Sequence, residues 1–159
     1  MAYKEEIERK FLVDQTKLPP LPAPKWLVQG YLSANPTVRL RLEQGPEQRK
    51  GYLTIKGEGL VGRDEFEYDL PADEVEQMLR LAKGFLVSKR RYDLPVPGAP
   101  ELKWELDIFE GDNEGLIVAE LEMPSYDYAF ERPEWLGQDV TEDARYKNAA
   151  LSRRPYKNW

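Results

Sequence analysis

The chain has 159 residues, of which 41% are hydrophobic and 33% charged, and its formal net charge is −6 at pH 7. This length suits one domain with a real core, residues 1–159, and the composition argues against intrinsic disorder. The sequence has no Cys and no His, which excludes disulfides, zinc-finger sites, thiol nucleophiles and an imidazole base.

Any chemistry must therefore use carboxylates, Lys, Arg, Tyr or hydroxyl groups. Carboxylates suit hard cations such as Mg²⁺ or Mn²⁺. The negative net charge disfavours nonspecific binding of nucleic acid. The first ten residues carry no apolar signal core, and no run approaches the length of a membrane-spanning helix. We expect a cytoplasmic protein with no membrane or nucleic-acid partner.

The first half of the chain predicts short antiparallel strands. EIERKFLV (6–13) opens it, and the proline-rich LPPLPAPKW that follows cannot sit in a central strand. Alternating runs separated by Gly, Pro and Asn then predict strands at 26–33, 37–44, 51–58 and 63–70.

One helix is expected after these strands, opening at Pro71 with Asp73 as its N-cap. Its apolar stripe, which ends before Gly84, comprises Val75, Met78, Leu79 and Ala82. Further strands are predicted at 85–94, 102–111 and 116–123, which makes about eight. Residues 125–159 are expected to form two short helices with an irregular piece around Pro133 and Gly137.

One face of almost every predicted strand is charged. Successive side chains of a strand point to opposite faces, so Glu6, Glu8 and Lys10 share one. Like charges recur two residues apart in five pairs: Glu6/Glu8, Arg39/Arg41, Glu65/Glu67, Lys89/Arg91 and Glu120/Glu122. For any single strand, the solvent-exposed face of a half-solvated sheet explains the charged residues. It explains the pattern over all the strands together less well, because Arg, Lys, Glu and Asp dominate the whole face.

Same-sign neighbours repel, so each pair gains from an opposite charge between or across from its members. Acidic pairs therefore invite divalent cations, and basic pairs invite phosphate. A barrel with its charged face inward would hold both, and eight strands leave room for one small ligand. The predicted fold is α+β and mainly antiparallel β: a closed eight-stranded tunnel-like barrel with a charged interior and a few flanking helices.

The segment EIERK resembles the E-x-E-x-K opening of the CYTH superfamily, the triphosphate tunnel metalloenzymes. Further segments appear in the family's order: GYL, VRLRLE, LTIKGEG, EFEYDL, SKRRY, WELDIFEG, AELEM and VTEDARYKN. The resemblance covers nearly the whole chain. It implies a tunnel of eight antiparallel strands whose site selects a triphosphate.

The resemblance also implies roles for single residues. Those matching the family's ligands for Mg²⁺ or Mn²⁺ are Glu6, Glu8, Asp107, Glu120 and Glu122. Those matching its phosphate-binding residues are Lys10, Arg39, Arg41, Lys56, Lys89 and Arg91. Tyr31 matches a tyrosine that acts with the motif lysine, Lys10, in positioning or deprotonating water. Because a free Tyr has a pKa of about 10, Tyr31 acts as a base only if Lys10 and its basic neighbours lower that pKa. The alternative is a wall residue hydrogen-bonded to Lys10.

Other residues are expected to play supporting parts. Glu65, Glu67 and Glu105 would pair with basic side chains, and Arg90 is left out because its parity is opposite. The segment 139–148 resembles the family's plug over one tunnel mouth. Within it, Arg145 and Lys147 are candidate phosphate contacts, while capping and turn roles are expected for Asp143 and Asn148.

The function expected first is metal-dependent hydrolysis of a small-molecule triphosphate, with inorganic tripolyphosphate favoured by the compact length and the lack of a base-recognition insertion. A class IV adenylate cyclase and a thiamine triphosphatase stay open. For the latter, Trp26 or Trp135 would supply a ring platform, although a core position is expected for both. A noncatalytic polyphosphate- or nucleotide-binding module is disfavoured because all the matched carboxylates are present. A homodimer also stays open.

Overall fold

The computed structural model of the chain describes residues 3–59 and 61–159. Its strands are β1 (Tyr3–Val13), β2 (Lys25–Ala34), β3 (Thr37–Gln44), β4 (Arg49–Lys56), β5 (Gly62–Leu70), β6 (Lys83–Val96), β7 (Ala99–Glu110), β8 (Ile117–Glu122) and β9 (Leu136–Asp139). Its α-helices are α1 (Ala72–Met78) and α2 (Asn148–Arg153), and short 3-10 turns join several elements.

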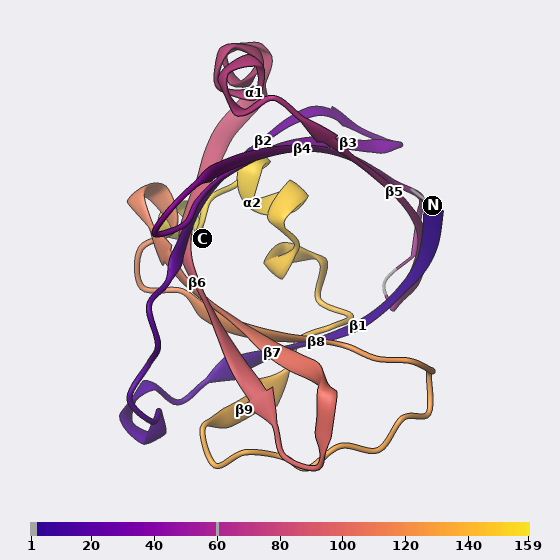
Figure 1. The fold of residues 1–159 in the computed structure, drawn as a ribbon, viewed down its shortest axis with the longest axis vertical. Coiled ribbons are helices and arrows are strands. Elements are labelled where there is room, and N and C mark those ends of the chain that lie inside the picture. The colour runs from indigo at the N-terminus through magenta and orange to yellow at the C-terminus, as the bar shows by residue number, and fades with distance from the viewer. Residues whose placement is uncertain (1–2, 60) are drawn as a thin grey trace.

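Eight of the strands close into a barrel. They follow the order β5-β4-β3-β2-β6-β7-β8-β1, and β1 pairs back with β5 to close the ring seen in Figure 1. Neighbouring strands of the described residues pair antiparallel, as the short strands and tight turns of the sequence predict. The predicted eight-stranded antiparallel barrel is confirmed.

The apolar faces of the strands point outward and are covered there. Trp104 and Phe11 lie at the centre of one outer core, and the segment that carries Trp135 covers them. A second outer core joins Leu40 of β3 to Val75 of α1. Turning the barrel's apolar face outward leaves the charged face to line the interior.

One end of the interior departs from the expected charged lining. Val87, Phe109 and Val118 have the inward parity, and they pack around Leu151 of α2 in an apolar cluster. Figure 1 shows α2 inside the outline of the ring. Gly84 permits this close docking, because its φ is +75° and a Cβ there would lie 2.3 Å from the Ser152 carbonyl oxygen. The C-terminal segment therefore plugs part of the barrel with apolar side chains.

Three local predictions are wrong. Asp73 does not cap α1, since Pro71 is at the N-cap and the Asp73 carboxylate pairs with Arg49 instead. The helix is also shorter than expected, because the chain tightens into a 3-10 turn after Met78 and Gly84 already belongs to β6. β9 was not predicted, because its four residues, LGQD, carry no alternation and form a strand only by pairing with the edge of β1.

No helix of the described residues is long and apolar enough to cross a membrane.

Leu151 tests the apolar plug. Leu151→Ala is expected to lower the free energy of unfolding by about 2 to 4 kcal/mol, because the side chain is fully buried among rigid strands. Leu81→Ala is the matched control, since Leu81 is 70% exposed, and it should cost less than about 0.5 kcal/mol. Urea unfolding followed by fluorescence measures both, and equal losses would contradict the plug.

Candidate active site

A cavity of about 790 Å³ occupies the barrel, a size typical of small-molecule sites. Strands contribute most of its lining, and the β4–β5 turn and the C-terminal segment contribute most of the rest. Ten basic and eleven acidic side chains line it. Charge is therefore nearly balanced, and the cavity has no large positive excess with which to neutralise a polyanion by itself.

Glu6, at the start of the E-x-E-x-K segment, is held by two basic residues. Lys56 Nζ lies 3.0 and 2.9 Å from its two carboxylate oxygens, and Arg63 Nε lies 3.1 Å from Oε1. Burial by itself raises the pKa of Glu6, but Lys56 and Arg63 outweigh it and hold that pKa well below its ordinary value. Glu6 is thus an ionised carboxylate at neutral pH.

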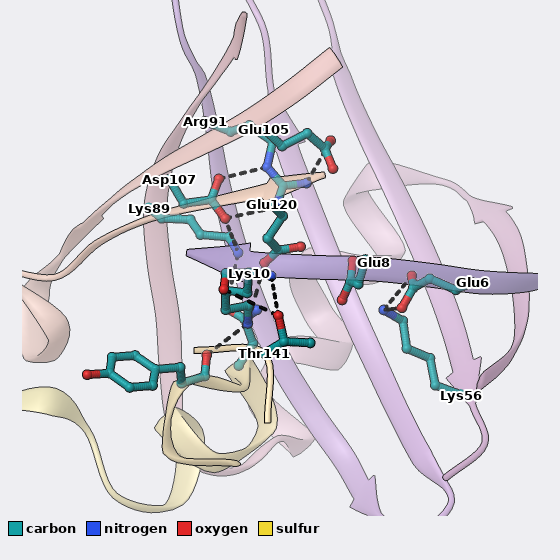
Figure 2. Close-up of polar contacts among 12 residues, drawn as sticks. Glu6, Glu8, Lys10, Lys56, Lys89, Arg91, Glu105, Asp107, Glu120 and Thr141 are labelled. Carbon is teal, nitrogen blue, oxygen red and sulfur yellow. Dashed lines mark hydrogen bonds and ion pairs between the residues drawn. The ribbon is translucent and has the colours of Figure 1, made fainter. Parts of the chain in front are cut away.

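Glu8 has the opposite electrostatic environment. Figure 2 shows it on β1 between Glu6 and Glu120. Burial and the charges of these two carboxylates raise the pKa of Glu8 to about 8, and Arg63 Nη2 is 3.7 Å away. Across the strand pair Glu8 faces Glu122 of β8, which also lines the cavity. The carboxyl group of Glu8 is therefore largely protonated near neutral pH, and a bound cation would favour its ionised form.

Lys10 points into the cavity from the end of the same motif. Its Nζ donates a hydrogen bond to the Tyr146 carbonyl oxygen at 2.9 Å and lies 3.5 Å from Glu120 Oε1. Burial raises the pKa of Glu120, but Lys10 and the cations behind it bring that pKa well below its ordinary value. Lys10 therefore links the acidic wall to the C-terminal segment.

Arg39 and Arg41 keep donors available on the β3 wall. Arg39 Nη2 donates to Thr54 Oγ1 at 3.3 Å, and Arg41 lies 3.0 Å from Glu43 and 4.8 Å above the Tyr52 ring. The buried Arg39 Nε group has no hydrogen-bond partner, whereas Arg41 Nε makes the 3.0 Å ion pair with Glu43. A buried donor left unpaired is costly, so the Arg39 guanidinium group would gain from an anion in the cavity.

Lys89 and Asp107 lie behind the cavity wall instead of lining it. Both side chains are fully buried and lie 2.8 Å apart. Asp107 also accepts two hydrogen bonds of 2.8 Å from Arg91, whose Nη1 donates to Glu105 at 3.2 Å (Figure 2). Arg91 and Glu105 do line the cavity. Lys89 and Asp107 thus form a fully buried pair, called the sealed pair below, and Asp107 orients Arg91. This pair lies apart from Glu6 and Glu8 in Figure 2.

Tyr31 lines the cavity, but the condition for its acting as a base is not met. Burial raises the pKa of Tyr31, and the opposing effect of Arg39 does not reverse this. Lys10, the expected partner, donates to Tyr146 instead. A phenol with a raised pKa can hydrogen-bond and position a ligand but is a poor base near neutral pH.

The supporting carboxylates are paired as expected. Glu65 lies 3.4 Å from Lys56, and Glu67 lies 3.7 Å from Arg41. Glu105 pairs with Arg91. Arg90 pairs with Glu110 and is not part of the cavity lining, which agrees with its opposite parity.

The C-terminal plug is confirmed, with two changes. Asp143 caps the 3-10 turn at Ala144–Tyr146, and Lys147 lines the cavity while its Nζ donates to the Gly59 carbonyl oxygen at 2.8 Å. Arg145 is exposed, pairs with Asp143 and does not line the cavity. Asn148 does not cap α2; its Oδ1 accepts a hydrogen bond from Lys89.

Neither candidate ring platform reaches the cavity. Trp26 is 47% exposed, so the expected core position is wrong for it. Trp135 is buried in the outer core, as expected. The lining includes neither side chain.

Arg63 is a site residue that the sequence interpretation missed. It lines the cavity and contacts both Glu6 and Glu8. The signal was available, because Arg63 has the same parity on β5 as Glu65 and Glu67.

The donor chemistry of the acidic wall fits a hard divalent cation. Its ligands are carboxylates only, the type that Mg²⁺ and Mn²⁺ prefer. Among the described residues, no three acidic side chains converge tightly enough to hold an ion in their present conformations. The excess of negative charge around Glu8 nevertheless matches a site that a cation would complete.

A closed antiparallel barrel with arginine side chains on one inner wall and several carboxylates on another defines the class of fold to which the chain belongs. The CYTH domain family model matches residues 4–156, and the chain belongs to this family. It is 38% identical over 159 residues to an inorganic triphosphatase of Acetivibrio thermocellus, covering 98% of this chain and 97% of that protein. It is 40% identical over 154 residues to an inorganic triphosphatase of Nitrosomonas europaea, covering 92% and 96%.

Solved structures agree with this assignment. The crystal structure of the inorganic triphosphatase NE1496 matches with a TM-score of 0.65 and 36% identity, covering 92% of this chain and 93% of that one. A Pyrococcus horikoshii protein, PH1819, matches with a TM-score of 0.55 at 18% identity, which shows a shared fold.

Asp107→Asn tests the sealed pair. The substitution leaves Lys89 buried without its carboxylate and should lower the free energy of unfolding by about 3 kcal/mol. The control is Glu110→Gln, which breaks the outer pair with Arg90 and should cost less than about 1 kcal/mol. Denaturant unfolding at pH 7 compares them. Unchanged stability in Asp107→Asn would contradict a stabilising role for the pair with Lys89.

Proposed function

We propose that the protein is a metal-dependent triphosphatase that hydrolyses the terminal phosphoanhydride bond of inorganic tripolyphosphate. The observation that carries the proposal is the cavity itself, in which arginine side chains, among them Arg39 with an unpaired Nε donor, face a carboxylate wall inside a closed barrel. The two named relatives are both inorganic triphosphatases and match nearly the whole chain.

The basic residues would bind and orient the substrate. Phosphoryl transfer needs little covalent help from the protein, so positioning and charge neutralisation do most of the work. Arg39 and Arg41 offer planar donors for phosphate oxygens, and Arg91 is held in a fixed orientation by Asp107. Lys56 would supply a point charge, and it needs no large movement because it already lines the cavity.

The acidic wall would hold the cation. The residues proposed for this are Glu6, Glu8, Glu120 and Glu122, which all line the cavity. A bound Mg²⁺ or Mn²⁺ would neutralise phosphate charge and lower the pKa of an attacking water. Glu6 would share its carboxylate between this role and its pairs with Lys56 and Arg63. Asp107 is not included, since two cations already enclose it.

Lys10 and Tyr31 would position the reacting groups. Lys10 extends between the carboxylate wall and the C-terminal segment, where its ammonium can bind a phosphate oxygen. Tyr31 would donate its hydroxyl hydrogen to phosphate or water, because its raised pKa keeps it protonated. The protein therefore needs no tyrosinate base.

A substrate panel tests this function. Phosphate, pyrophosphate and cyclic AMP are measured after incubation with tripolyphosphate, ATP or thiamine triphosphate, each with Mg²⁺, Mn²⁺ or chelator. The expected result is fast release of phosphate from tripolyphosphate, lost in chelator. Cyclic AMP and pyrophosphate from ATP would assign a cyclase instead. No turnover, with a higher melting temperature in tripolyphosphate, would assign a binding module.

Two substitutions in the cavity test the proposed roles. Arg41→Ala and Glu8→Gln should each lower kcat/KM for tripolyphosphate by about 100-fold, because each removes charge at the reacting phosphates or their cation. Both proteins should remain folded by circular dichroism, since neither side chain belongs to an apolar core. Arg49→Ala, on the outer surface beside Asp73, is the control and should retain full activity. Near-normal turnover in either cavity variant would overturn the assignment.

A further inference from the structure

The wall of the barrel has a seam beside Lys10. On one edge of β1, β5 pairs with residues as far as Ile7, and the Glu8 amide then donates to the Val61 carbonyl oxygen. β9 pairs with the same strand again at Phe11 and Val13. Between these stretches, no strand of the described residues covers the edge at Lys10.

The segment after β9 fills this seam. The Lys10 amide donates to Thr141 Oγ1 at 2.9 Å, and the Val140 amide donates to the Lys10 carbonyl oxygen at 2.8 Å. A side-chain oxygen thus replaces the strand carbonyl that a barrel wall would normally provide. Lys10 Nζ also binds the Tyr146 carbonyl oxygen, so one segment holds Lys10 at its amide, its carbonyl and its ammonium group.

Thr141 is itself held by Asp139. Asp139 Oδ1 accepts hydrogen bonds from the Thr141 amide at 2.9 Å and from the Thr141 hydroxyl at 2.5 Å, and Arg9 pairs with Oδ2. A hydroxyl has one hydrogen to donate. Because Asp139 takes that hydrogen, the oxygen presents a lone pair to the Lys10 amide. Thr141 is 7% exposed and lines the cavity.

The same local motif occurs elsewhere without this function. Asp14 accepts hydrogen bonds from the Thr16 amide at 3.1 Å and from the Thr16 hydroxyl at 2.6 Å, which reproduces the Asp-x-Thr geometry in an exposed turn. Thr16 lies on the surface and outside the cavity lining. The Asp-x-Thr turn therefore has a local structural use in both places, and only Thr141 extends it to a site residue.

We infer that Thr141, oriented by Asp139, is a positioning residue that fixes the backbone of Lys10 and so places its ammonium group for triphosphate cleavage. The inference rests on the proposed function. It gives the side-chain hydrogen bond from the Lys10 amide to Thr141 a role in the reaction, although Thr141 need not touch the reacting atoms.

The test compares Thr141→Val with Thr141→Ser and with Thr16→Val as the matched control. Val keeps the shape of Thr but cannot accept the Lys10 amide, so kcat/KM for tripolyphosphate should fall about tenfold. Thr141→Ser retains the hydroxyl and should stay within about twofold of the wild type. Thr16→Val should leave kcat/KM unchanged. Thermal melts establish that each protein is folded at the assay temperature.

A second readout does not depend on turnover. Hydrogen exchange of the Lys10 amide, followed by NMR, should accelerate about tenfold in Thr141→Val and not in Thr16→Val. If Thr141→Val does not fold, Asp139→Asn replaces it with Asp14→Asn as control, and an activity loss of about threefold is expected only in the former.

The outcomes separate the two proposals. A wild-type protein without triphosphatase activity would overturn the proposed function. An active wild type, with normal kcat/KM and a protected Lys10 amide in folded Thr141→Val, would overturn only the role of Thr141.

Discussion

Mutual pairing of charges inside a closed barrel is the interaction on which the rest of the structure depends. A buried carboxylate or ammonium group is costly unless an opposite charge and hydrogen bonds compensate it. The protein meets this requirement with a few linked groups, such as Glu6 between Lys56 and Arg63, and Asp107 between Lys89 and Arg91. These pairs hold the wall in shape, so the less fully paired groups, Glu8 and the Nε donor of Arg39, remain available for ligands.

The division of the interior follows from the same cost. At one end the inward positions are apolar, and Leu151 of the C-terminal segment fills the space between them. Along the rest of the barrel most inward positions are charged, and charged side chains dominate the cavity lining. Apolar packing around Leu151 thus stabilises the end of the barrel that the plug fills. The charged side chains around the cavity can then be arranged for ligand binding.

Strand parity predicted most of this from the sequence. Alternation placed Glu6, Glu8 and Lys10 on one face, and the closed antiparallel barrel agrees with it. Strand parity predicts which face of the sheet a side chain lies on but not how deeply it is buried. It therefore grouped Lys89 and Asp107 with the cavity lining, although both are fully buried and only Arg91 of this cluster lines the cavity. β9 and the seam at Lys10 were beyond prediction, because LGQD carries no strand alternation and the seam is closed by the side-chain oxygen of Thr141. Arg63 was within reach of the same parity argument and was overlooked.

The position of β1 also determines when the site forms during folding. This strand is made before its partners β5, β8 and β9, and the hydrogen bond from Lys10 to Thr141 spans 131 residues. Loop-closure entropy must be overcome before such distant contacts give any stability. The acidic pair of β1 therefore gains its surroundings only after β8 and the segment that carries Thr141 have been synthesised. A nascent or truncated chain would present the E-x-E-x-K segment as an open edge strand, and the complete tunnel would appear with the final closure of the barrel.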